Sequence, residues 1–303
     1  MALVRTFILL MLAAVPLWGQ QPYIQILGVA QDGGYPHIGC EKVCCAPSGQ
    51  EVKKQFVVSL ALVNPAMQQW WLFEATPDLK EQVHAFRQST HAQYSFLPSG
   101  IFISHAHMGH YAGLLQLGRE ALGSKEVPVY VLPRMEKYLH ENGPWSQLVN
   151  LKNIVTIPLK AEQPVALAPN ISVTAFTVPH RDEFSETAGF IIAFADKKIL
   201  FVPDIDKWEK WNLKIEEAVK QVDYALLDAT FYHATELPNR SMSEVPHPLV
   251  VETLARFESK PELKSRIYFI HFNHTNPLLW NKAEQDALRA KGYNVAETGM
   301  ILR

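Results

Sequence analysis

Three shortages narrow the classes of protein to which this 303-residue chain can belong. Cysteine is scarce: the three cysteines all lie between residues 40 and 45, too few and too close together for a disulfide framework. Neither sign of charge is in excess, since 28 Lys and Arg face 30 Asp and Glu, and this balance argues against binding nucleic acid or an anionic membrane. Long apolar runs are missing after residue 20, so the sequence beyond that point contains no candidate membrane span.

The N-terminus carries the one apolar run that needs an explanation. Arg5 precedes the apolar residues 6–15, a run shorter than a membrane span, and the small residue Gly19 follows. This order is typical of a secretory signal peptide. We therefore expect residues 1–20 to be a signal peptide, residues 21–303 to form a single domain, and the protein to be secreted or periplasmic. A retained anchor or a buried N-terminal strand is the alternative.

The rest of the sequence alternates between short β-rich runs and amphipathic helical stretches, with no repeat. The predicted strands are 23–29, 56–63, 70–73, 100–104, 128–132, 154–158, 171–178, 189–194, 198–202, 224–228, 266–271 and 295–302. The predicted helices are 78–88, 111–122, 208–221, 248–257 and 282–291. Many strands are hydrophobic on both faces, so the pattern favours an α/β sandwich of two sheets flanked by helices over one Rossmann-type sheet.

The twelve histidines include three that follow one predicted strand, namely His105, His107 and His110. Alternate residues at the end of an extended strand point the same way, so His105 and His107 can bind one metal ion, and His110 lies a turn later. Neutral imidazoles bind zinc at about 2.0–2.1 Å, and catalytic zinc sites keep three protein ligands and an open position. The spacing therefore predicts a metal centre.

Three later strands also end in residues of the metal-ligand type: His180, Asp204 and His271. Each alone is an ordinary way to end a strand. Together with the histidine cluster they form an ordered set of five histidines and one aspartate at strand ends, where side chains from several strands can converge.

In this ordered set the chain resembles the metallo-β-lactamase superfamily of αββα hydrolases, whose cluster reads His-x-His-x-Asp-His. The resemblance implies an αββα sandwich of two mixed β-sheets flanked by helices. It also implies a first metal site formed by His105, His107 and His180, a second formed by His110 and His271, and Asp204 as the bridging and catalytic carboxylate.

Other motifs resemble a subgroup of this superfamily, the coenzyme PQQ biosynthesis protein B family and the related cyclic phosphodiesterases of phosphonate degradation. The segments concerned are 28–45, 75–79, 228–231 and 270–277. In the phosphodiesterases a histidine acts as general acid or base, and His247 lies at the matching place. By its spacing alone His247 is equally an ordinary residue at a helix start.

Position 109 departs from the superfamily pattern, because Gly109 stands where the superfamily has Asp, a ligand of the second metal. We expect the second metal to bind weakly or to be absent. Glu74 is a candidate replacement, although a hydrogen-bonding role is favoured. A second departure is that many PQQ proteins lack the histidine pair matched here by His105 and His107, which favours a hydrolase relative over a member of the PQQ pathway.

The cysteines have a candidate fourth partner. The phosphodiesterase relatives hold a structural zinc with three cysteines and a histidine three residues beyond the last active-site ligand, and His274 follows His271 by that spacing. Cys40, Cys45 and His274 match the relatives, whereas Cys44 departs from them. Thiolates with one imidazole form a closed tetrahedral zinc site. The alternative is a set of thiols without metal, or partly oxidised.

The resemblance implies a metal-dependent hydrolase of a phosphodiester or another small ester or cyclic substrate. The expected cofactor is one or two divalent ions, zinc with manganese or iron as alternatives, because such ions lower the pKa of bound water from 15.7 to about 7. Two other functions stay open: an iron-dependent oxidative role related to PQQ, and a non-catalytic periplasmic binding or carrier protein. The expected partner is a small molecule, with no nucleic acid and no membrane after signal cleavage; a monomer and a homodimer both stay open.

Overall fold

The computed structural model describes residues 21–46, 52–237, 241 and 244–303. The predicted signal peptide, residues 1–20, lies outside the described residues. Among the helices that are described, none has the length and apolar character needed to cross a bilayer.

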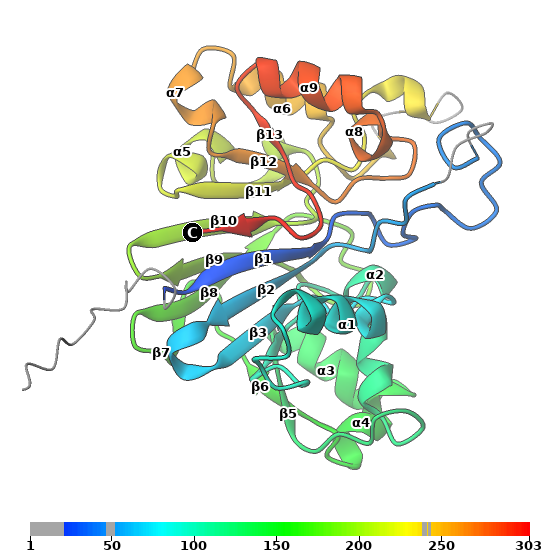
Figure 1. Ribbon diagram of the computed structural model, residues 1–303, viewed down its shortest axis with the longest axis vertical. Helices are drawn as coiled ribbons and strands as arrows, with labels where there is room; N and C mark the ends of the chain where they lie inside the picture. Colours follow the sequence, from blue (N-terminus) through cyan, green and yellow to red (C-terminus); the bar gives the residue numbers. More distant parts are fainter. Residues whose placement is uncertain (1–20, 47–51, 238–240, 242–243) are drawn as a thin grey trace, which may run out of the picture.

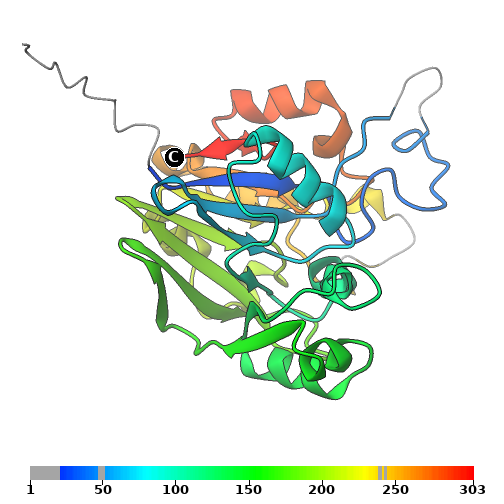
Figure 2. The same cartoon turned by 60° about the horizontal axis from the view of Figure 1, so that its bottom comes forward.

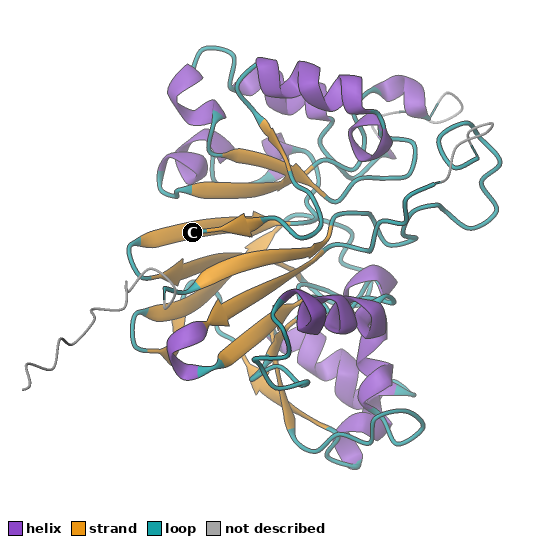
Figure 3. Ribbon diagram, in the orientation of Figure 1, coloured by secondary structure: helices purple, strands orange, loops and turns teal. Residues whose placement is uncertain are grey.

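Two mixed β-sheets make up the centre of the described structure (Figures 1 and 3). The first sheet has the order β14-β1-β2-β3-β4-β5-β6, and its strands are β1 (Tyr23–Gly28), β2 (Ser59–Asn64), β3 (Gln69–Phe73), β4 (Ile101–Phe102), β5 (Val127–Val131), β6 (Ile154–Pro158) and β14 (Ile301–Leu302). The second has the order β13-β12-β11-β10-β9-β8-β7, and its strands are β7 (Pro164–Ala168), β8 (Ile171–Val178), β9 (Thr187–Phe194), β10 (Lys197–Val202), β11 (Tyr224–Asp228), β12 (Ile267–Ile270) and β13 (Asn294–Val295).

Helices form an outer layer on each side of the two sheets, as Figures 1 and 2 show. They are α1 (Leu79–Ser89), α2 (Met108–Tyr111), α3 (Pro133–Glu141), α4 (Trp145–Asn150), α5 (Ile215–Lys220), α6 (Val250–Arg256), α7 (Pro261–Lys264), α8 (Pro277–Trp280) and α9 (Lys282–Ala290), with short 3-10 turns at Pro65–Met67, Ala112–Leu117, Trp208–Lys210 and Ala234–Glu236. Helices α1 to α4 lie with the first sheet and α5 to α9 with the second. This is the αββα sandwich that the sequence predicted.

The alternation of side chains along β3 explains the four layers. Trp71 and Phe73 point into the core between the sheets, where Phe73 stacks on Phe102 and meets Phe201 of the second sheet edge-on. Trp70 points the other way and packs on Phe86 of α1, with ring centroids 4.5 Å apart. Successive residues of a strand face opposite sides of its sheet, and each large buried apolar side chain contributes about 1.5–3 kcal/mol. A strand that is apolar on both faces therefore needs a layer on each side.

Three predicted elements are wrong in detail. The single strand predicted over 295–302 is two strands, β13 and β14, which belong to different sheets; a turn closed by the hydrogen bond from Met300 N to Glu297 O separates them, with Gly299 at φ +92°. The helix predicted over 111–122 is α2 followed by a 3-10 turn. The helix predicted over 208–221 is split because Trp211 and Lys214 have extended backbone. The sequence patterns also missed β7, α3, α4, α7 and α8.

Candidate metal centre

The carboxyl ends of several strands meet at one edge of the sandwich. His180 follows β8, Asp204 follows β10 and His271 follows β12. Strands β10, β11 and β12 are parallel neighbours, and β8 runs the same way as β10 because both are antiparallel to β9. The end of β4 in the first sheet brings His105 to the same place, since its Nε2 lies 3.5 Å from Oδ2 of Asp204. The structure therefore brings the predicted strand-end ligands together.

His105, His107 and His180 form the first group of candidate ligands. Nε2 of His105 lies 2.8 Å from Nδ1 of His107, and the ring centroid of His180 lies 5.1 Å from that of His107. Outer partners fix two of the rings: Oγ of Ser104 lies 2.8 Å from Nδ1 of His105, and Oε2 of Glu183 lies 3.2 Å from Nε2 of His107. Each of these two rings therefore keeps its other nitrogen for the group.

Asp204 is the centre of the cluster, because its carboxylate lies within 4.0 Å of five imidazoles. The distances are 2.8 Å to His110, 3.3 Å to His247, 3.4 Å to His271, 3.5 Å to His105 and 3.9 Å to His180. The side chain is 2% exposed. A buried carboxylate in this position can contribute to two neighbouring metal sites.

A second group consists of Asp32, His110, Asp204 and His271, whose candidate ligand atoms all lie within 4.8 Å of one another. Asp32 comes from the loop after β1, and its Oδ1 lies 3.2 Å from Nε2 of His110. Glu74, considered above as a replacement ligand, lies at the other ring nitrogen: its Oε2 is 3.4 Å from Nδ1 of His110 and accepts a hydrogen bond from the Ser104 backbone. Glu74 thus orients His110 and is outside the group.

His247 lies next to both groups and is held by buried partners. Its Nδ1 is 2.8 Å from Oδ2 of Asp228 and 3.1 Å from Oγ1 of Thr230. Thr230 donates a hydrogen bond to Asp228 and lies 2.9 Å from Nδ1 of His271. Asp228 and Thr230 therefore orient His247 and His271 together.

Burial and neighbouring charges divide the histidines into two kinds. Burial lowers the pKa of His105 well below its usual range and that of His180 to about 4, so both imidazoles are neutral near pH 7 and can bind metal. Burial also opposes protonation of His110, but Glu74, Asp204 and Asp32 outweigh it and raise the pKa of His110 well above the usual value. Burial opposes protonation of His247 as well, and Asp228 outweighs it, so its pKa is raised. The carboxylates around His110 and His247 therefore favour a positive charge at these two positions.

The backbone is strained at two places in the centre. Glu74 has φ 68° and His271 has φ 65°, in the left-handed region that side-chain-bearing residues rarely adopt. Such a conformation costs about 1–3 kcal/mol and is typical of functional sites. Glu74 orients the candidate ligand His110, and His271 is itself a candidate ligand, so both strained residues belong to the centre.

The exposed fractions of the side chains show which residues of the centre meet solvent. The side chains of His107 and Asp32 are 12% and 24% exposed, whereas those of His105, His180 and His271 are at most 1% exposed. Glu183, 46% exposed, lies against His107. The centre therefore meets solvent at His107 and Asp32.

The donor atoms of the centre fit divalent metal ions. Several of them are buried and make no hydrogen bond within the described part of the chain: Oδ1 of Asp32 and Asp204, Nε2 of His110 and His271, and Nδ1 of His180. Buried polar atoms without partners are rare and costly, unless an ion completes them. Imidazole nitrogen and carboxylate oxygen are donors for zinc, manganese and iron. The residues therefore fit one or two divalent ions.

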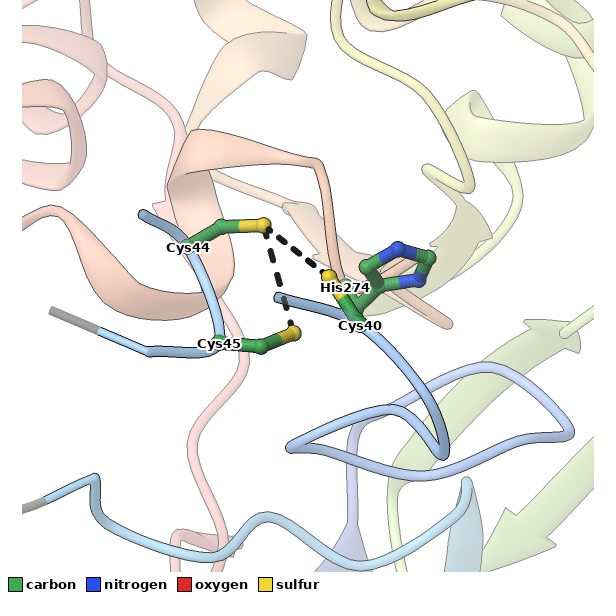
Figure 4. A group of neighbouring side chains, drawn as sticks. All are labelled: Cys40, Cys44, Cys45 and His274. Carbon is green, nitrogen blue, oxygen red and sulfur yellow. Dashed lines mark hydrogen bonds between the residues drawn. The ribbon is translucent and has the colours of Figure 1, made fainter. Parts of the chain in front are cut away.

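A separate group brings together the three cysteines and His274, with candidate ligand atoms within 4.8 Å of one another (Figure 4). Sγ of Cys44 lies 3.9 Å from Sγ of Cys40 and 3.9 Å from Sγ of Cys45, well beyond the roughly 2.05 Å of a disulfide. Burial and the neighbouring His37 lower the pKa of His274 to about 4, so its imidazole is neutral near pH 7. Cys44, which departs from the pattern of the relatives, lies within the group.

Two residues of the centre were missed by the sequence reasoning. Asp32 and Asp228 fall within the family motifs 28–45 and 228–231, but neither was assigned a role. A signal for both exists, because each carboxylate lies at the end of a strand or shortly after one, as Asp204 does. The glycine pair Gly33-Gly34 after Asp32 marks the turn that returns the loop to the site.

The profile of the Beta-lactamase superfamily domain matches residues 69–272, about two thirds of the chain, and the chain belongs to this superfamily. Its two mixed β-sheets flanked by helices are the metallo-β-lactamase fold.

Similar proteins point to one branch of the superfamily. Coenzyme PQQ synthesis protein B from Methylorubrum extorquens (strain PA1) is 23% identical over 311 residues, with 92% of this chain and 99% of that protein covered. The protein of the same name from Pseudomonas savastanoi pv. phaseolicola is 26% identical over 319 residues, with 92% and 99% covered. Among solved structures, zinc-bound PqqB from Methylobacterium extorquens has a TM-score of 0.75 at 21% identity, covering 93% and 99% of the two chains. A diphosphatase of the PhnP family has a TM-score of 0.68 at 20% identity, covering 93% and 96%.

Proposed function

We propose that this protein is a metal-dependent hydrolase that acts on a phosphodiester or another small ester or cyclic substrate. One observation carries the proposal: Asp204 lies within 4.0 Å of five imidazoles, and one of them, His247, is held by a carboxylate of its own. Ligands for divalent ions beside an oriented proton-transfer group are the parts that metal-assisted hydrolysis requires.

The ligand residues have distinct roles. His105, His107 and His180 hold one ion, and Asp204 faces both ligand groups. When bound, a divalent ion supplies Lewis acidity and a water acidified to a pKa of about 7. Ser104 and Thr230 fix the rings of His105 and His271, so the ligand nitrogens are oriented before substrate arrives.

His247 transfers the proton. Asp228 engages Nδ1, which leaves Nε2 to hold the proton that the leaving oxygen takes up. A positioned general acid contributes typically about 10²–10⁴-fold to the rate. The raised pKa of His247 supports this role, because a larger fraction of the imidazole is protonated near pH 7.

The substrate class rests on the structural neighbours. A diphosphatase of the PhnP family shares the fold along nearly the whole chain, which supports an ester of phosphorus. Substrate would reach the ions from the side of His107 and Asp32, the candidate ligands that meet solvent.

Hydrolysis assays test the proposal. The full chain, loaded with zinc, manganese or iron, is assayed with generic phosphodiester and lactone substrates beside a His105→Ala/His107→Ala variant. We expect turnover that this variant lacks, and in a His247→Ala variant a kcat lower by about 10²–10⁴-fold with the metal content unchanged. Turnover by the wild-type chain no higher than that of the double variant would refute the proposed hydrolase activity.

A second candidate is a role like that of coenzyme PQQ synthesis protein B. The observation in its favour is the 23–26% identity along 92% of this chain. Histidine and carboxylate ligands with open positions also suit iron and dioxygen. Oxygen consumption that requires bound iron and is lost with zinc would favour this function over hydrolysis.

We also propose that the cysteine group holds a structural zinc ion. Three thiols and one neutral imidazole are a closed donor set of the kind found in structural zinc sites. Such an ion would connect the loop of residues 40–45 to the segment after β12.

A further inference from the structure

Asp32 reaches the centre from an unexpected part of the chain. It belongs to the loop after β1, far in sequence from the histidines, and its Oδ1 lies 3.2 Å from Nε2 of His110 and 4.0 Å from Nε2 of His271. Nε2 of His271 in turn lies 3.4 Å from Oδ2 of Asp204. Two ligands each about 2.1 Å from a tetrahedral zinc ion are roughly 3.4 Å apart, so these spacings are those of a metal site.

The atoms of this group point at one another without forming hydrogen bonds. Oδ1 of Asp32, Nε2 of His110 and Nε2 of His271 are buried, and none has a hydrogen-bond partner among the residues described. The side chains of His110 and His271 are fully buried. Donor atoms in this state lack the partner that a bound ion would supply.

Gly109 and Asp32 fit each other sterically. A Cβ atom at position 109 would lie 2.0 Å from Oδ1 and 2.7 Å from Cα of Asp32. The second contact is to backbone, which a side-chain rotation cannot relieve. A side chain at position 109 and the observed place of Asp32 therefore exclude each other.

The backbone on either side of Asp32 is tied to the segment that carries His271. Gln31 N donates to the carbonyl of Phe272, the residue after His271, over 2.8 Å. Nδ2 of Asn273 donates to Oε1 of Gln31 over 2.6 Å, and Gly34 N closes a turn onto the Gln31 carbonyl. Asp32 is thus presented to the centre by hydrogen bonds to the same strand end that presents a ligand.

The charges of the centre also call for cations. Glu74, Asp204 and Asp228 are buried, and Asp32 is mostly buried. In the described part of the chain these carboxylates form ion pairs with histidines and with no lysine or arginine. Buried carboxylates are stable only when paired or bound to metal. An ion between His110 and His271 would give Asp32 and the far side of Asp204 a cationic partner.

We propose that Asp32 is the carboxylate ligand of a second divalent-ion site formed with His110, Asp204 and His271, and that residue 109 must be glycine because Asp32 occupies its side-chain space. The inference rests on the proposed metal centre. It replaces the expectation, drawn from Gly109 alone, that the second metal is weak or absent.

Zinc content tests the inference without an activity assay. The folded full chain is dialysed against buffered free zinc, and zinc per chain is measured by mass spectrometry across a range of free zinc concentrations. Loss of even an outer partner of a ligand costs about 10–100-fold in metal affinity. Asp32→Ala should therefore bind the second ion at least about 100-fold more weakly than the wild-type chain does. Asp32→Asn, which keeps the shape of the side chain, should also lose affinity. Asp196→Asn, at a side chain 84% exposed in the turn between β9 and β10, is the control and should keep every ion.

A side chain at position 109 tests the steric part. Gly109→Ala, whose Cβ would lie 2.7 Å from Cα of Asp32, should displace the loop of Asp32 and weaken the second ion by at least about 100-fold, as Asp32→Ala does. An Asp32→Ala variant that is folded by circular dichroism and keeps the second ion at wild-type affinity would overturn the proposal. A His110→Ala variant that binds as much zinc as the wild-type chain would also overturn it. If instead the His105→Ala/His107→Ala variant keeps all its zinc, the proposed metal-dependent function fails.

Discussion

The candidate ligands of the metal centre come from the ends of four strands, from helix α2 and from one returning loop, whereas three of the four side chains in the cysteine group come from residues 40–45. The centre therefore forms only when both sheets are assembled. The cysteine group needs one short loop and a single distant residue, His274, three residues beyond His271. The two sites therefore depend on the fold to different degrees and share one segment, residues 271–274.

Asp204→Asn should have the largest effect and should affect the centre alone. The carboxylate faces both ligand groups, so we expect both ions of the centre to be lost, with affinities weaker by more than about 100-fold, and hydrolysis to fall to the level of the His105→Ala/His107→Ala variant. Zinc analysis should still find the ion of the cysteine group. Retention of both ions of the centre would contradict the bridging role.

Cys40→Ser tests the opposite half of the comparison. We expect loss of one zinc ion and lower stability, because a structural ion binds only the folded chain. A loss of about 2–3 kcal/mol would lower Tm by roughly 4–12 °C in a chain of this size. Thermal unfolding and zinc analysis measure both effects, with Asp196→Asn as the control. Unchanged zinc content would show that the cysteines are thiols without metal.

Asn273→Ala should have the smallest effect and tests the segment that the sites share. It removes the hydrogen bond to Gln31, typically about 0.5–1.5 kcal/mol, which corresponds to at most about a tenfold weaker second ion. Zinc titration at low free zinc measures this change, and the first ion should keep its affinity. Equal weakening of both ions would mean that Asn273 supports the whole centre rather than the loop of Asp32.

The strand-end ligands were predictable because their positions follow from chemistry that the sequence carries locally. His105 and His107 differ by the two-residue period of an extended chain, and His180, Asp204 and His271 each follow a run of β-forming residues. The two-sheet sandwich was predictable for a similar reason, since strands such as β3 are apolar on both faces.

Asp32 could not be placed in this way. Its position depends on how a loop returns to the sheet edge, and that path is set by contacts with Phe272 and Asn273 at the other end of the chain. The separation of β13 from β14 has the same cause, because the choice between two sheets is made by tertiary pairing and not by propensity.

The pairing of β1 with β14 has a consequence for the order of folding. Residues 301 and 302 join the sheet beside the strand that leads to Asp32, and the contact between Gln31 and Asn273 spans 242 residues. Contacts so distant in sequence form late, after the local hairpins. Both sheets and the second ligand group are thus incomplete until the C-terminal segment from β12 to β14 has joined the rest of the chain.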